Sequence, residues 1–270
     1  MNKFYIQIAL FLLSVSVYLN NKALATEPAP GKATEIKSKD CYATSEEIFE
    51  KSKHLLCTNP EEIKNAKKLM NEAISHLKYH ATSKDGYKFV GGNSRRSTFL
   101  YKKKHKDNTN VEKVTYTKND PNKYNKVVGK LWDPDIICLL DNRSVKRKVA
   151  RVYNPNLVII QQRFKKWPWG RWKYFYALAT KVEISENKTI IAMTSANIND
   201  HHPSDKEYKN TIIENANLFK TDIDSEEDII KGTLKKVFVN IAGYIIEKKD
   251  KHVGITYVHS VSDIQILITQ

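Results

Sequence analysis

The stretch Trp172-Lys173-Tyr174-Phe175-Tyr176-Ala177-Leu178-Ala179-Thr180-Lys181-Val182-Glu183-Ile184 decides the fold class of this chain. Its side chains alternate between two faces, and a period of two residues predicts a β-strand. The bulkier face is expected to point inward and to line a packed core or a ligand cavity, which periodicity alone does not distinguish. That face carries Trp172, Tyr174, Tyr176, Leu178, Thr180, Val182 and Ile184.

The chain around this stretch predicts further strands, separated by turns such as Asn154-Pro155-Asn156 and Glu186-Asn187-Lys188. Helices are predicted at 45–54, from the Asn59-Pro60 cap to about 84, and at 120–132. In the region 204–235, Ile212-Ile213 and Leu218-Phe219 favour a strand, and 222–231 a loop or short helix. Helices followed by an antiparallel meander predict an α+β fold. The strands are expected at 87–90, 98–102, 111–117, 147–153, 157–164, 189–197, 237–247 and 253–261.

The first 25 residues have the layout of a secretory signal peptide. Lys3 is followed by an uncharged apolar run over 4–19, and Ala23-Leu24-Ala25 forms a small-residue cleavage site. The run is short for a membrane span, although an uncleaved anchor is the alternative. Residues 26–45 are poor in large apolar side chains and predict a flexible leader. The remaining residues, 46–270, are long enough for one domain with a sizeable core.

The chain is strongly basic, with a net charge of +15 from 45 basic and 30 acidic residues. Cleavage after Ala25 removes two basic residues and no acidic one, which leaves +13. Such a charge attracts anionic surfaces, but it equally serves plain solubility. Lys dominates over Arg, which weakens any case for bidentate phosphate recognition.

Motifs for catalysis are missing from the sequence, so no catalytic residue and no cofactor is predicted. It has no Gly-x-Ser-x-Gly, no Gly-x-Gly-x-x-Gly, no Gly-Lys-Ser/Thr loop and no His-Glu-x-x-His. His76 and His80 stand four apart on a predicted helix, but no third ligand follows, so no metal site is predicted. Three cysteines allow at most one disulfide, for which Cys41 and Cys57 are the candidates.

Aromatic and basic residues alternate in the stretch 164–172. Indole rings with Lys or Arg suit the head-group level of a membrane, they also suit base stacking, and an ordinary hairpin with an exposed tip explains them equally. We expect the first, as transient contact with an anionic membrane surface. The predicted membrane-contact residues are Lys165, Lys166, Trp167, Trp169 and Arg171.

Several blocks resemble the Plasmodium fam-a proteins, and the likeness covers nearly the whole chain. The blocks are 21–31 (NKALATEPAPG), 55–62 (LLCTNPEE), 130–134 (KLWDP), 151–157 (RVYNPNL), 194–200 (TSANIND) and 239–247 (VNIAGYIIE). Segments 240–247 and 255–258 also resemble the late strand pair of START (StAR-related lipid-transfer) domains, and 195–203 resembles a START turn with His and Pro.

This resemblance implies a helix-grip fold, in which a curved antiparallel sheet clasps a C-terminal helix over a lipid-sized cavity. It implies non-enzymatic binding and transfer of phospholipid, with phosphatidylcholine the expected ligand and a monomer the expected state. The residues expected to line the cavity are Arg151, Tyr153, Trp172, Tyr174, Tyr176, Leu178, Thr180 and Val182. No nucleic-acid partner is expected, because no known module is present and the secretory route argues against one.

The chain departs from the START pattern at its end. The last predicted strand ends near Val261, and 262–270 is too short for the amphipathic helix that roofs the cavity in START domains. Residues 263–268 look more like a strand, so we expect an incompletely closed cavity.

The leading hypothesis is a secreted lipid carrier in the parasitophorous vacuole or the host erythrocyte. Export rests on family likeness, since 22–26 only faintly resembles the Arg-x-Leu-x-Glu export motif. The alternative is a host-cell-surface interaction protein or antigen that keeps the START scaffold without carrying lipid.

Overall fold

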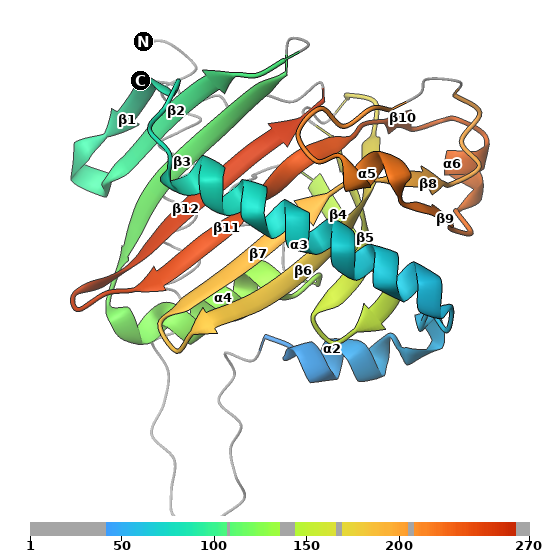
Figure 1. Cartoon of the computed structure of the whole chain (residues 1–270), viewed down its shortest axis with the longest axis horizontal. Coiled ribbons are helices and arrows are strands. Elements are labelled where there is room, and N and C mark those ends of the chain that lie inside the picture. Colours follow the sequence, from blue (N-terminus) through green and yellow to red (C-terminus); the bar gives the residue numbers. More distant parts are fainter. Residues whose placement is uncertain (1–41, 107–108, 136–143, 166–168, 205–207, 263–270) are drawn as a thin grey trace, which may run out of the picture.

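One large antiparallel sheet organises the computed structural model, which describes residues 42–106, 109–135, 144–165, 169–204 and 208–262 (Figure 1). Within these residues the strand order is β1-β2-β3-β12-β11-β7-β6-β5-β4, and the short β10 pairs in parallel with β6. The strands are β1 (Lys88–Asn93), β2 (Thr98–Lys104), β3 (Asn110–Asn119), β4 (Ser144–Asn154), β5 (Leu157–Lys165), β6 (Lys173–Ser185), β7 (Lys188–Thr194), β10 (Lys235–Lys236), β11 (Val239–Lys248) and β12 (His252–Val261). The expected α+β fold with a curved antiparallel sheet is confirmed.

Strand β6 is buried on both of its faces. Tyr174 and Leu178 are fully buried on the bulky face, and the other face buries Phe175, Ala177 and Ala179 almost as completely. A sheet strand with two buried faces requires cover on both sides of the sheet. At the centre of β6 the bulky face points inward, as expected. Ile184 lies toward the hairpin tip and is 44% exposed.

The 23-residue helix α3 (Pro60–Thr82) covers the first face, which we call the α3 face (Figure 1). The helix begins at the predicted cap, where Asn59 Oδ1 accepts hydrogen bonds from the amides of Glu61 and Glu62. Leu69, Met70 and Leu77 pack in one buried cluster with the bulky face of β6 and with β7 and β11. This cluster therefore fixes α3 on the sheet.

Helices α4 (Tyr124–Trp132) and α2 (Ser45–Lys51) cover the opposite face, which we call the α4 face. Figure 1 shows α4 behind the sheet and α3 in front of it. Val128, Leu131 and Trp132 of α4 and Ile48 of α2 share a second buried cluster with Ala179 and other residues of this face. Short 3-10 turns precede α4 (η3, Pro121–Lys123) and follow α2 (η1, Lys53–Leu55), and η2 (Ser94–Arg96) joins β1 to β2.

The segment from β7 to β10 adds to the cover of the α3 face. It contains β8 (Asn197–Asn199), α5 (Asn215–Leu218), β9 (Lys220–Asp222) and α6 (Glu227–Ile230). The predicted strand over 212–219 is wrong, because Ile212 and Ile213 lie in a turn whose amides bond to the Asn210 side chain. The short helix expected in 222–231 is confirmed as α6.

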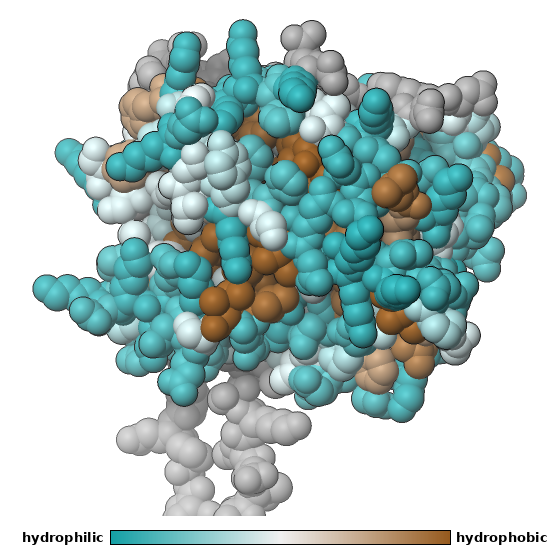
Figure 2. All heavy atoms as spheres, in the orientation of Figure 1, coloured by the Kyte–Doolittle hydropathy of each residue, from teal (hydrophilic) through white to brown (hydrophobic). Residues whose placement is uncertain are grey.

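Figure 2 shows that the surface on the α3 side is mostly hydrophilic, with apolar side chains visible in smaller patches. Leu218 of α5 is the most exposed apolar residue of this segment, at 73%.

None of the described helices is long and apolar enough to cross a membrane. The signal peptide, nearly all of the leader, Cys41, Cys138 and the predicted strand at 263–268 lie outside the described residues.

Gly243 of β11 is a position where both the backbone of β7 and the side chain of Leu77 from α3 lie too close to leave room for a Cβ. Its φ is +153°, and a Cβ there would lie 2.1 Å from the carbonyl oxygen of Ile191 and 2.9 Å from Leu77 Cδ2. We predict that Gly243→Ala lowers the free energy of unfolding by about 2 kcal/mol or more, from strain and overpacking. Urea denaturation followed by circular dichroism measures this change.

Gly254→Ala on the neighbouring strand β12 is the matched control. The nearest atom to a Cβ there is Lys249 Cε at 3.5 Å, so its effect should stay within about 0.5 kcal/mol. Equal stabilities of the two variants would show that α3 does not depend on this contact.

Candidate functional site

A pocket lies on the α4 face, between the sheet and the helices α2 and α4. Its volume is about 20 Å³, room for a single water molecule. Ten of its eleven lining residues are apolar, and the eleventh is Arg147 of β4. The apolar lining consists of Ile48, Leu131, Trp132, Pro134, Val149, Val158, Ile160, Ala179, Ile191 and Met193.

Small side chains at the centre of β6 help to make this space. On the α4 face, β6 carries the small residues Ala177 and Ala179. On its other face the same part of the strand carries the bulky residues Tyr176 and Leu178. An alanine fills little of the layer between a sheet and a helix, so the ring of Trp132 and the side chain of Leu131 complete the wall. The contrast of small and bulky faces is the sequence signal that could have located the pocket.

Two polar groups belong to the pocket wall. Arg147 donates hydrogen bonds from Nε and Nη2 to Gln162 Oε1, at 3.0 and 2.8 Å. Among the described residues it forms no ion pair with a carboxylate. Trp132 is 7% exposed, and its buried indole Nε1 has no hydrogen-bond acceptor in the part of the chain that the structure describes. A buried donor without an acceptor costs about 1–3 kcal/mol.

The predicted cavity-lining residues lie elsewhere, and none of the eight is part of this pocket. Tyr174, Tyr176 and Leu178 are buried on the α3 face, where α3 and the segment after β7 fill the space above them. Thr180 Oγ1 donates to the Asn156 carbonyl oxygen, and Trp172 and Val182 are half-buried. The interpretation of this face as a cavity wall is therefore replaced by that of a filled core, and lipid contact by these residues stays a prediction without geometric support.

Polar contacts occupy the hydroxyl groups on that face. Tyr174 OH donates to Asp200 Oδ2 at 2.8 Å, and Lys236 Nζ lies 2.7 Å from the other oxygen of the same carboxylate. Tyr176 OH accepts a hydrogen bond from Gln161 Nε2 at 2.6 Å and lies 2.9 Å from Ser225 Oγ. These bonds attach β6 to the covering segment, which is a structural role.

Arg151 and Tyr153 are likewise engaged by a carboxylate of α3. Glu62 Oε1 accepts hydrogen bonds from Arg151 Nη1 at 2.8 Å, Tyr153 OH at 2.7 Å and Thr221 Oγ1 at 2.9 Å. Burial raises the pKa of Glu62, but these bonds and the Arg151 charge outweigh it, so the net pKa falls below its ordinary value. The group joins α3, β4 and β9 and leaves the Arg151 guanidinium paired.

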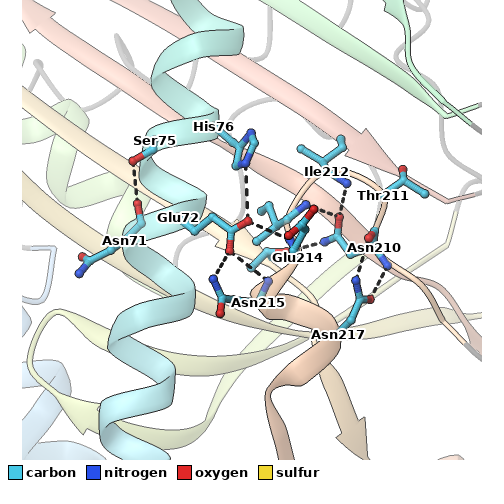
Figure 3. A network of polar contacts seen from close by, with 12 residues as sticks. Asn71, Glu72, Ser75, His76, Asn210, Thr211, Ile212, Glu214, Asn215 and Asn217 are labelled. Atoms are coloured by element: carbon cyan, nitrogen blue, oxygen red, sulfur yellow. Dashed lines mark hydrogen bonds and ion pairs between the residues drawn. The ribbon is translucent and has the colours of Figure 1, made fainter.

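Glu72 connects α3 to α5 in the same way (Figure 3). Its carboxylate accepts bonds from the amides of Glu214 and Asn215 and from Asn215 Nδ2, and His76 Nε2 lies 3.7 Å from it. Asn210, 2% exposed, donates from Nδ2 to Thr194 Oγ1 and to the Asn240 carbonyl, which ties the same loop to β7 and β11.

The spacing of His76 and His80 does not make a metal site. His80 Nδ1 lies 2.9 Å from Tyr87 OH, and burial, with nearby positive charges, lowers the pKa of His80 to about 4. The two histidines therefore have separate partners. No group of three or more His, Cys, Asp or Glu side chains suited to a metal ion occurs within the described ranges.

The predicted membrane-contact turn is described only in part. Trp169 is 95% exposed, whereas Lys166 and Trp167 lie outside the described residues. Arg171 donates to the carbonyl oxygens of Thr233 and Gly232, and Lys165 Nζ lies 5.2 Å from the centre of the Trp172 ring. An exposed indole thus lies near basic residues in the connection between β5 and β6.

Comparison with solved structures shows the fold. The chain is similar to human StAR-related lipid transfer protein 5, with a TM-score of 0.52 and 9% identity over 76% of this chain and 85% of that one. It is also similar to human STARD10, with a TM-score of 0.50 and 13% identity over 72% and 68% of the two chains. No protein-family model and no curated protein matches the sequence. The fold is therefore START-like.

A partly exposed ion cluster beside the α3 face offers a pH test of this architecture. Arg163 contacts Asp228 and Glu226, and Glu226 also pairs with Lys148. Burial raises the pKa of Glu226, but hydrogen bonds from Lys148 and Gln161 outweigh it, and the pKa falls to about 2. A carboxylate with a lowered folded-state pKa stabilises the fold above its unfolded pKa, and that stabilisation disappears as the pH falls through the folded value.

We predict that wild-type protein loses stability from this group between about pH 4.5 and pH 2, and that Glu226→Gln shows a shallower loss. The expected difference is on the order of 1 kcal/mol, since Glu226 is partly exposed and screened. Urea midpoints measured across this pH range test it. Glu186→Gln, in an exposed turn, should follow the wild-type curve, and identical curves for both variants would contradict the assignment.

Proposed function

We propose that this protein binds a lipid in the apolar layer between the α4 face and the helices α2 and α4, and that it carries the lipid between membranes without catalysing a reaction. The observation that supports this most is the pocket of ten apolar residues with one cationic side chain in its wall. Ligand sites are concave and mostly apolar, with few polar groups that orient the ligand. The START-like fold, shared with a protein named for lipid transfer, supports the same proposal.

Lipid entry requires this layer to widen. A space of about 20 Å³ holds no acyl chain, so α4, α2 or the side chains between them and the sheet have to move outward. Each methylene transferred from water into the layer contributes about 0.8 kcal/mol, which can offset the cost of separating these helices. The bound state in this proposal has acyl chains where Leu131, Met193 and their neighbours now meet.

The remaining parts of the proposal rest on the sequence. Residues 1–25 favour entry into a secretory pathway, and the likeness to fam-a proteins favours the parasitophorous vacuole or the host erythrocyte as the destination. The same likeness favours phosphatidylcholine as the ligand and a monomeric carrier. The basic chain and the exposed Trp169 favour a transient contact with anionic membrane surfaces.

A second candidate function has its own observation. The small volume of the pocket fits a protein that keeps the START-like scaffold as an interaction surface or antigen on the host cell and no longer carries lipid. The two candidates differ in one property, the presence of a lipid in the purified protein.

We predict that the chain from Thr26 onward extracts phosphatidylcholine from donor vesicles and delivers it to acceptor vesicles, because the α4-face layer gives the acyl chains an apolar environment. Fluorescent-lipid transfer and native mass spectrometry measure the two steps. Protein that carries no lipid in native spectra and moves none between vesicles would support the scaffold function instead.

We also predict that the protein binds anionic vesicles and that this binding weakens as salt rises, since Coulombic attraction between exposed charges is screened. Trp169→Ala should weaken vesicle binding several-fold through loss of the exposed indole, measured by vesicle sedimentation. Leu218→Ala, which removes another exposed apolar side chain, is the control. Binding that is insensitive to both salt and Trp169→Ala would contradict this contact.

A further inference from the structure

Although most residues that line the pocket on the α4 face are apolar, two of the lining residues carry hydrogen-bond donors. These two are Trp132, with its indole Nε1, and Arg147, with its guanidinium. The Nε1 atom is buried without an acceptor among the described residues, and Arg147 is half-buried with an amide oxygen as its partner. No carboxylate lies within ion-pair distance of Arg147 in those residues.

The other partly buried arginines of the sheet, unlike Arg147, are paired with carboxylates. Arg151 has Glu62, and Arg163 has both Asp228 and Glu226. A guanidinium that is withdrawn from water is stable only when its charge is compensated. Arg147 is thus the basic side chain in a pocket wall whose counter-charge the described protein residues do not supply.

The nearest carboxylate in sequence to Trp132 is already in use. Asp133 is 5% exposed, and its two oxygens accept hydrogen bonds from the amides of Ala43 and Asp135, at 2.8 and 2.9 Å. It therefore serves to anchor the start of α2 and the end of α4. Trp132 Nε1 therefore has no acceptor among the described residues, and Arg147 has the neutral amide oxygen of Gln162 but no carboxylate.

We propose that Trp132 Nε1 and Arg147 bind an anionic phosphate oxygen of a phospholipid whose acyl chain lies on Val149, Val158, Ile160 and Ile191. This deepens the proposed function and rests on it. A guanidinium forms strong, directed hydrogen bonds to phosphate, and an indole N–H is a donor without any acceptor capacity. The apolar remainder of the wall suits the hydrocarbon part of the same molecule.

The chemistry separates a phospholipid from two simpler ligands. Diacylglycerol has the same chains and no phosphate, and inorganic phosphate has the anion and no chain. The polar donors predict that the protein prefers a short-chain phosphatidylcholine to the diacylglycerol of the same chains. The apolar wall predicts that it prefers the same phosphatidylcholine to inorganic phosphate.

The test is isothermal titration of the purified protein with these three ligands. Arg147→Met should weaken phosphatidylcholine binding by about tenfold or more, and Trp132→Phe by several-fold, because hydrogen bonds to a charged group are lost. Neither change should alter the affinity for diacylglycerol by more than about twofold. Arg95→Met, which changes an exposed arginine outside the pocket, is the matched control and should bind all three ligands like wild type.

Each outcome bears on the proposal. Equal weakening for phosphatidylcholine and diacylglycerol would mean that the variants damage the pocket and not a phosphate contact, which would overturn it. Binding of inorganic phosphate as tight as that of phosphatidylcholine would also overturn it. If phosphatidylcholine binds well and Arg147→Met has no effect, lipid binding stands and only this assignment fails. If no lipid binds at all, both this assignment and the proposed function fail.

Discussion

Apolar side chains on both faces of the central strands are the constraint on which this structure depends. Strand β6 buries Tyr174 and Leu178 on one side and Phe175 and Ala177 on the other, so neither side of the sheet can face water. The chain meets this requirement with α3 and the segment after β7 on one face and with α4 and α2 on the other.

The two layers are held by different chemistry, and this difference locates the site. Carboxylates fix the cover of the α3 face, through Glu62 to Arg151 and Tyr153, Glu72 to Asn215, and Asp200 to Tyr174. Buried bonds of this kind are costly to break because the partners would be left unpaired. On the α4 face the contacts between cover and sheet are mostly apolar. The Asp133 carboxylate there joins the chain before α2 to the end of α4, and one buried bond, between Tyr124 OH and Thr189 Oγ1, joins α4 to β7. A face of this kind can separate from its cover at lower cost.

The sequence predicted the strands closely because their alternation is local, as in 172–184, and because Asn59 and Pro60 mark a helix start without tertiary information. It failed at 212–219, where the side chain of Asn210 bonds to the turn and overrides the apolar pattern. It also expected the cavity on the face of β6 with the largest side chains, where the structure has a buried cluster, whereas the pocket lies on the other face. Which face is filled depends on Glu62, Glu72 and Asp200, whose partners lie 26 to 159 residues away and leave no periodic signal.

The central claim is that a lipid enters the α4 face and leaves the α3 face closed. Hydrogen exchange of backbone amides with and without bound phosphatidylcholine tests it most directly, because each face is covered by a different helix. The account predicts changed exchange in α4, over Tyr124–Trp132, and in neighbouring amides of β6 and β7, with unchanged exchange in α3. Changes confined to α3 and to the segment after β7 would place the lipid on the Tyr174 face and contradict the account.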